Sequence, residues 1–164
     1  MLNRLQGVFR SFQRHDVKYV VIGGIAAVLH GVPRTTFDLD ILIEATRENA
    51  RRLLEALLEA GLSTAELTSW QEILANEITI FKDRLRVDVQ TSTPGLSFSD
   101  AWSNRVTVTF QGQDFFIVSK ADLIRSKRAS GRPVDLEDAR LLELAELGDA
   151  EPAPRDDIVL PPET

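Results

Sequence analysis

The chain has 164 residues, 43% of them hydrophobic, which is enough for one domain with a sizeable core. It has no cysteine, which excludes disulfides and thiolate chemistry, and its net charge of −6 argues against broad, non-specific binding to nucleic acid. No apolar run is long enough to span a membrane, and the amphipathic start lacks the core and cleavage site of a signal peptide. We therefore expect a cytoplasmic protein with no membrane partner.

Hydrophobic periodicity and turn residues predict a mixture of helices and strands. In chain order the expected elements are an opening amphipathic helix, strand 18–22, helix 25–30, strand 38–43, helix 46–60, helix 67–75, strands 78–81 and 85–90, a helical turn at 98–104, strands 106–110 and 115–118, helix 119–128 and helix 135–147. Thr46, Ser119 and Asp135 are the expected N-caps, and Gly61 and Gly131 the expected stops.

This order, in which hairpins alternate with helices, predicts an α+β fold with a mixed or mostly antiparallel sheet. We expect one domain over residues 1–147, with a helical C-terminal part from residue 118. Residues 148–164 are rich in proline and acidic residues, which predicts a flexible tail.

Two aspartates, Asp38 and Asp40, stand one residue apart on a predicted strand. Side chains two residues apart on a strand project from the same face, so these carboxylates should repel each other unless a cation lies between them. The segment 85–90 alternates strictly, which places Asp88 on the polar face of its strand. If the two strands are neighbours, Asp38, Asp40 and Asp88 form a carboxylate triad that suits Mg²⁺ or Mn²⁺ and two-metal phosphoryl or nucleotidyl transfer.

Gly23 and Gly24 lie where a buried strand gives way to a short helix. Glycines at such a junction let the backbone approach a phosphate closely, and the first turn of the helix offers free N–H groups. Arg34, shortly before the two acids, is either a surface arginine in a loop or a partner of those acids or of a phosphate. The order of a strand, two glycines, a helix and a strand with Asp-x-Asp predicts a phosphate-binding turn that faces a metal site.

These residues together resemble the signature of the DNA polymerase beta-like nucleotidyltransferase superfamily. The resemblance rests on Gly23-Gly24, the thirteen residues that follow, and Asp38-Leu39-Asp40-Ile41. It is closer to the small bacterial branch, that is, the minimal nucleotidyltransferases and the abortive-infection type nucleotidyltransferase toxins. Members of that branch often have a His-Gly after the helix and an Arg-x-Thr before the acids, as His30-Gly31 and 34–36 do here.

The branch also tends to carry a C-terminal lysine, then an arginine, then spaced acids. Here these are Lys127, Arg132, Asp135 and Asp138, and Val134 stands where a basic residue is common. The likeness implies that Lys127 and Arg132 contact the triphosphate. The alternative is that they are basic residues near the end of a helix, where positive charge is favourable in any protein.

The resemblance, which spans residues 18–143, implies a metal-dependent nucleotidyltransferase that moves a nucleoside monophosphate from an NTP to a hydroxyl group. The acceptor that it allows is a protein side chain, a tRNA end or a small molecule. A partner protein or a second copy in a homo-oligomer would help to shape that side, because the chain has little room for an acceptor-binding domain. The main alternative is a non-catalytic protein of the same fold that binds a partner, as in a toxin–antitoxin pair.

Overall fold

The computed structural model describes residues 2–147, so the predicted tail at 148–164 lies outside the described residues. The elements in chain order are α1 (Leu2–Arg14), β1 (Tyr19–Ile22), α2 (Gly23–Leu29), β2 (Leu39–Ile43), α3 (Arg47–Glu59), a 3₁₀ helix (Ser63–Leu67), α4 (Trp70–Ala75), β3 (Ile78–Lys82), β4 (Arg86–Gln90), α5 (Phe98–Ser103), β5 (Val106–Phe110), β6 (Gln113–Ile117), α6 (Lys120–Ser130) and α7 (Pro133–Leu147). The α+β prediction is confirmed.

The strands form one six-stranded sheet in the order β3-β4-β2-β1-β6-β5. Three neighbouring pairs are antiparallel, namely β1–β2, β3–β4 and β5–β6. Two pairs, β1–β6 and β2–β4, are parallel. The sheet is therefore mixed with an antiparallel majority, and the parallel pairing of β2 with β4 brings together two strands that lie far apart in the sequence.

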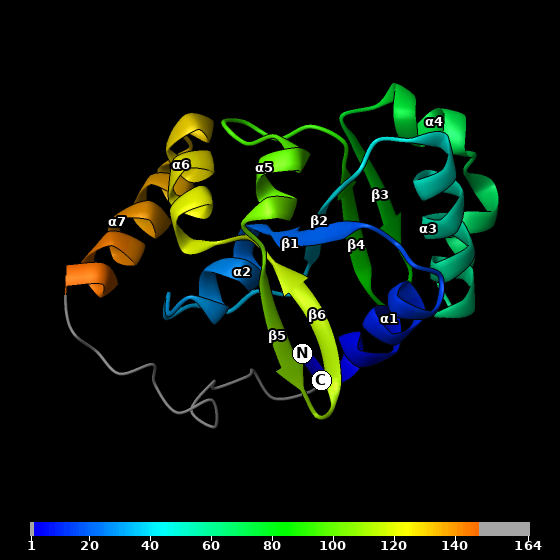
Figure 1. Cartoon of the computed structure of the whole chain (residues 1–164), viewed down its shortest axis with the longest axis horizontal. Coiled ribbons are helices and arrows are strands. Elements are labelled where there is room, and N and C mark those ends of the chain that lie inside the picture. Colours follow the sequence, from blue (N-terminus) through cyan, green and yellow to red (C-terminus); the bar gives the residue numbers. More distant parts are fainter. Residues whose placement is uncertain (1, 148–164) are drawn as a thin grey trace.

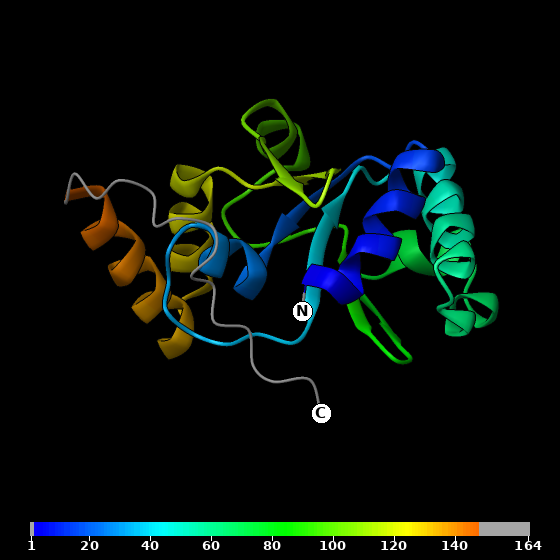
Figure 2. The same cartoon turned by 90° about the horizontal axis from the view of Figure 1, so that it is seen from below.

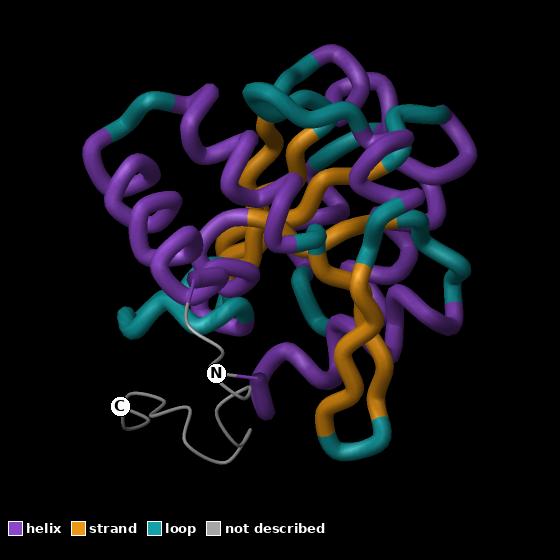
Figure 3. The backbone as a smooth tube through the Cα atoms, turned by 60° about the vertical axis from the view of Figure 1, so that its left-hand side comes forward, coloured by secondary structure: helices purple, strands orange, loops and turns teal. Residues whose placement is uncertain are grey.

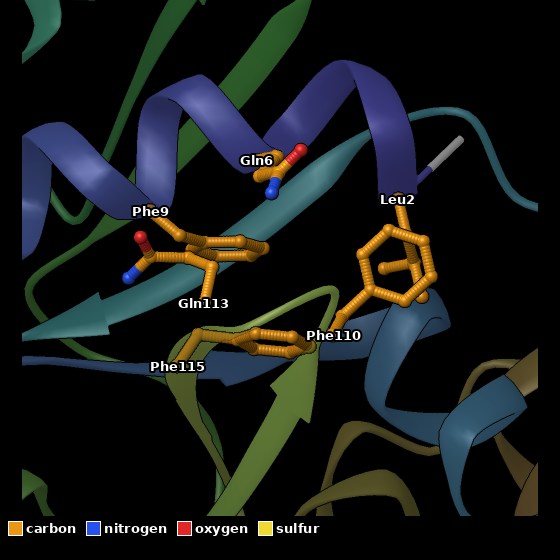
Figure 4. Close-up of a pocket in the computed structure, with 6 residues that line it drawn as sticks. All are labelled: Leu2, Gln6, Phe9, Phe110, Gln113 and Phe115. Carbon is orange, nitrogen blue, oxygen red and sulfur yellow. The ribbon is translucent and has the colours of Figure 1, made fainter.

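Helix α1 packs on the sheet through an aromatic cluster. The rings of Phe9 and Phe115 stack with centroids 4.2 Å apart, and Phe12 lies 4.8 Å from the Tyr19 ring. Figure 4 shows Phe9 of α1 above Phe115 of β6, in a crevice that is also lined by Leu2, Gln6, Phe110 and Gln113. The crevice lining has no ionisable side chain, so this region stabilises the fold and supplies no chemistry.

Most of the expected helix ends are confirmed. The Thr46 hydroxyl accepts a hydrogen bond from the Asn49 N–H at the start of α3, and Ser119 caps α6 in the same way. Gly131 ends α6 with φ of +69°, a conformation that glycine adopts at little cost. The helix expected at 67–75 is instead a 3₁₀ turn followed by α4, because Ser69 forms a capping box with Glu72 and starts a new helix there.

Two expected helix starts were wrong. The helix after β1 begins at Gly23 rather than at Ile25, so both glycines lie in the first turn of α2. The last helix begins at Pro133, because proline suits the first helical position. Asp135 is therefore inside the first turn of α7 and is not its N-cap.

The helices lie at both ends of the sheet. Figure 1 shows α6 and α7 packed together at the end of the molecule opposite α3 and α4, with α2 beside them. Figure 2, viewed from below, shows α1 and α3 side by side. The β5–β6 hairpin projects from the body in Figure 3.

Within residues 2–147, none of the helices combines the length and the apolar character that crossing a bilayer requires.

Candidate functional site

The three predicted acids come together at the β2–β4 pair. Asp40 and Asp88 are direct partners in the parallel register, and Asp38 comes immediately before β2, two residues from Asp40 and on the same face. The side chain of Asp38 is 45% exposed and that of Asp88 is 13% exposed, so the group opens to solvent on the Asp38 side. The hydrophobic residues that alternate with these acids on β2, Leu39 and Ile41, are fully buried and hold the strand in the core.

The surroundings of Asp40 oppose its negative charge. Burial raises its pKa to about 7, and the charges of Asp88 and Asp38 push it in the same direction. Lys127 and Arg86 act the other way, but they do not compensate for the two carboxylates. The acidic group therefore carries an excess of negative charge that a bound cation would relieve.

Arg86 is a member of this site to which the sequence analysis assigned no role. Its Nε donates to Asp88 Oδ1 at 2.9 Å and its Nη2 donates to Asp88 Oδ2 at 3.1 Å, which makes a two-pronged ion pair along one strand. The same Nε lies 3.8 Å from Asp38 Oδ2. The alternation of residues 85–90 placed Arg86 and Asp88 on one face, so the signal for their contact was present in the sequence.

The two glycines make room for side chains of the site. A Cβ on Gly23, whose φ is +68°, would lie 2.5 Å from Asp40 Oδ2. A Cβ on Gly24 would lie 2.6 Å from Thr36 Oγ1 and 3.2 Å from Arg34 Nη2. Glycine is thus required at both positions for the close approach of residues from the α2–β2 connection and β2, whether or not a phosphate binds there.

The predicted basic residues belong to an ion-pair network between the α2–β2 connection, α6 and α7. Arg34 donates to both carboxylate oxygens of Asp138, at 3.1 and 2.8 Å. The Lys127 Nζ lies 2.8 Å from Asp138 Oδ2 and 3.2 Å from Asp135 Oδ1. Arg132 Nε donates to Asp135 Oδ2 at 2.6 Å.

This network is buried at its centre and faces the acids at its edge. The side chains of Lys127 and Asp138 are only 6% and 2% exposed, whereas that of Arg132 is 72% exposed. The hydrogen bond with Asp135 is the main cause of the raised pKa of Arg132, and the Asp40 charge adds to it. The Lys127 charge partly offsets the burial that raises the pKa of Asp40. The network therefore lies close enough to the acids for their charges to interact. Arg34 pairs with Asp138 and not with the acids of β2 and β4.

The sum of formal charges in the network is positive. Arg34, Lys127 and Arg132 supply three positive charges, and Asp135 and Asp138 supply two negative ones, which leaves one positive charge. A surplus positive charge beside an acidic group suits a ligand that carries both phosphate groups and a divalent cation.

Histidine takes no part in this chemistry. His30 Nε2 is 2.7 Å from the Val118 carbonyl oxygen, so this ring joins the end of α2 to the start of α6. Burial lowers the pKa of His30 and keeps the ring neutral.

The carboxylates of Asp38, Asp40 and Asp88 suit a hard divalent cation by their chemistry, although their oxygens do not yet surround a common point. The three carboxylates offer only oxygen ligands, which Mg²⁺ and Mn²⁺ prefer. Within residues 2–147, however, no three Asp, Glu, His or Cys side chains already converge as a ligand cluster. At this site, both oxygens of Asp88 accept hydrogen bonds from Arg86.

Comparison with known proteins identifies the family and a structure with the same fold. A family model described as "Nucleotidyltransferase of unknown function (DUF6036)" matches residues 3–151. A crystal structure from Thermotoga maritima, described as a "putative nucleotidyltransferase (TM1012)", superposes with a TM-score of 0.52 at 17% sequence identity. The superposition covers 87% of this chain and 90% of that one, which shows a shared fold. No curated protein matched the sequence. Because the family model spans nearly the whole chain, this protein belongs to that family of nucleotidyltransferases of unknown function.

Proposed function

We propose that this protein transfers a nucleoside monophosphate from an NTP to an acceptor hydroxyl, with Asp38, Asp40 and Asp88 as ligands of Mg²⁺ or Mn²⁺. The observation that carries the proposal is the register of β2 and β4, which sets Asp40 directly beside Asp88 with Asp38 on the same face. When bound, the cation neutralises the triphosphate and favours the ionised form of the acceptor hydroxyl.

The chain's own residues divide the remaining work. Arg132, whose side chain is exposed, binds the phosphates on the side of α6 and α7, assisted by the backbone N–H groups of Gly23 and Gly24. Arg34 and the buried Lys127, both paired with Asp138, hold α7 in place and add positive charge behind the phosphates. Asp88 accepts the proton of the acceptor hydroxyl. The acceptor oxygen then forms its bond to the α-phosphorus as the bond to the β-phosphate oxygen breaks, and pyrophosphate leaves.

The acceptor approaches from the β3 side of the site. The phosphate-binding residues lie toward β1, α2 and α6, and β3 is the edge strand beyond β4. Ile80 is the register partner of Asp88 on β3 and is 53% exposed. That edge leaves room for an acceptor of any of the three kinds, namely a partner protein, a tRNA end or a small molecule. Transfer to a protein or a tRNA would fit the toxin role of the branch that the sequence resembles.

A second candidate function is that of a non-catalytic protein that binds a partner, such as an antitoxin. The observation that favours it is the pairing of Arg86 with Asp88, which engages one carboxylate of the triad. In that case the acids and Arg86 would serve the fold, and no nucleotide would be consumed.

Transfer of label from each α-³²P NTP separates the two candidates. The purified protein is incubated with Mg²⁺ or Mn²⁺, with and without cell lysate, and label is sought in protein, RNA and small molecules. Catalysis predicts acceptor-dependent labelling that falls at least a hundredfold in Asp40→Asn and Asp88→Asn. Asp16→Asn is the matched control, because Asp16 is 86% exposed and lies outside the site. Equal labelling by all four proteins would exclude the proposed acids, and no labelling by any of them would favour the non-catalytic candidate.

A further inference from the structure

We propose that Arg86 is an internal counter-cation that closes the Asp88 half of the site and must be displaced before a divalent cation binds there. The proposal rests on the proposed function, because it assumes that the acids are metal ligands, and it adds a step that regulates metal binding. It assigns to Arg86 a positioning role that acts through Asp88.

The first observation is that the guanidinium of Arg86 lies close to more than one carboxylate of the site. Arg86 makes two hydrogen bonds to Asp88 and lies 3.8 Å from Asp38. The guanidinium thus lies where its single charge offsets the carboxylates of Asp88 and Asp38, as a metal ion would.

The second observation is that this pairing opposes metal coordination by Asp88. Both Asp88 oxygens accept hydrogen bonds from Arg86, so a divalent cation at Asp88 would lie beside a guanidinium of the same charge sign and would share the same two oxygens with it. Asp40 itself is crowded, since its Oδ2 fills the space beside Gly23. Arg86 and a divalent cation therefore compete for Asp88.

The third observation is that Arg86 can leave. Its side chain is 37% exposed and lies on the open side of the site, so it can swing into solvent without opening the core. The network of Lys127 and Asp138, by contrast, is buried and fixed. The Asp38 side, with one longer contact to Arg86, should accept a first cation more readily than the Asp88 side.

Manganese titration followed by electron paramagnetic resonance tests the proposal, with Mn²⁺ alone as the probe. Wild type should bind one Mn²⁺ per chain more tightly than a second. Arg86→Gln should strengthen the weaker site by about tenfold, since a two-pronged ion pair no longer competes. Arg86→Lys, which keeps the charge but loses the second hydrogen bond, should lie between them. Arg84→Gln is the control. Arg84 lies two residues before Arg86, in the exposed turn between β3 and β4, so this variant removes the same charge outside the site.

Thermal unfolding supplies a readout that a merely structural role would not give. In EDTA, Arg86→Gln should melt at a lower temperature than wild type, because Asp88 and Asp38 lose their counter-ion. Saturating Mn²⁺ should remove that difference. A loss that persists in Mn²⁺, or equal Mn²⁺ affinities in wild type and Arg86→Gln, would overturn the role of Arg86 and leave the metal site intact. Absence of Mn²⁺ binding in wild type and in every variant would overturn both the role of Arg86 and the proposed metal site.

Discussion

Asp40 is the residue whose proposed role in metal binding has the highest cost in stability. It lies against Gly23, beside Asp88 and two residues from Asp38, and burial raises its pKa to about 7. A carboxylate in such surroundings lowers the stability of the metal-free protein when it is ionised. Proteins retain such groups where they serve binding or catalysis, so this cost itself supports a functional reading.

The raised pKa of Asp40 predicts a defined pH dependence. The folded protein keeps the Asp40 proton up to about pH 7, whereas the unfolded chain loses it near its ordinary value of 3.8. The contribution of Asp40 to stability is therefore lost as pH rises between about 4 and 7. In EDTA, Asp40→Asn should equal wild type near pH 4 and exceed it at pH 8 by about 1–4 kcal/mol, by urea unfolding. Equal free energies of unfolding at pH 8 would contradict the assigned environment.

Gly23 predicts a second effect at the scale of a residue. Gly23→Ala meets both a positive φ and the Asp40 carboxylate, whereas Gly112→Ala meets only a φ of +78° with no atom within 4 Å. We expect the backbone strain to cost ~1 kcal/mol in either variant. Gly23→Ala should lose at least a further ~1 kcal/mol from the clash with Asp40. Thermal unfolding of both variants checks this, and equal losses would show that the close approach to Asp40 is not required.

At the scale of elements, the buried ion pairs hold α6 and α7 against the α2–β2 connection. Lys127 lies between two carboxylates of α7, and Arg34 reaches Asp138 from 104 residues away in the sequence. Such a network fixes the direction of α7 and orders the basic groups that face Asp40. We infer that the C-terminal helices form one wall of the nucleotide site.

Removal of Lys127 tests this wall. Lys127→Met should lower the free energy of unfolding by about 3–5 kcal/mol, because Asp135 and Asp138 stay buried with less compensation. Arg140→Met provides the contrast, since Arg140 and Glu137 form an exposed pair on α7 whose loss should change the free energy of unfolding very little. Urea unfolding measures both. Similar small losses would mean that Lys127 is not held as the structure shows.

The sequence predicted most elements and the polar faces that carry the acids, for physical reasons that are local, whereas the triad was predicted only on the condition that the strands now seen as β2 and β4 are neighbours. Alternation over residues 85–90 placed Asp88 on a polar face, and capping chemistry placed Thr46 and Ser119 at helix starts. The contacts of Arg34 and Lys127 with Asp138 were beyond prediction, because they depend on the packing of separate elements. The start of α2 was missed because glycine has a low helix propensity, so two glycines do not indicate the first turn of a helix.

At the scale of the whole molecule, the sheet order places the proposed donor and acceptor on different sides. The strand β1 leads into α2 and pairs with β6, which leads into α6, and we propose that the phosphates bind on this side. The strands β4 and β3 lie on the other side, with the acids at the boundary between β2 and β4. A donor and an acceptor can thus meet at the acids from opposite directions, as in-line displacement at phosphorus requires.

The position of the label in the NTP tests the proposed reaction most directly. Wild type with Mg²⁺ and lysate should transfer ³²P to an acceptor from α-labelled NTP, release unlabelled pyrophosphate, and transfer nothing from γ-labelled NTP. The transfer of α-label and the release of pyrophosphate should both vanish in EDTA and in Asp40→Asn. Transfer from the γ-position would instead indicate a kinase. Label from the α-position that survives in EDTA or in Asp40→Asn would contradict the assignment of the acids.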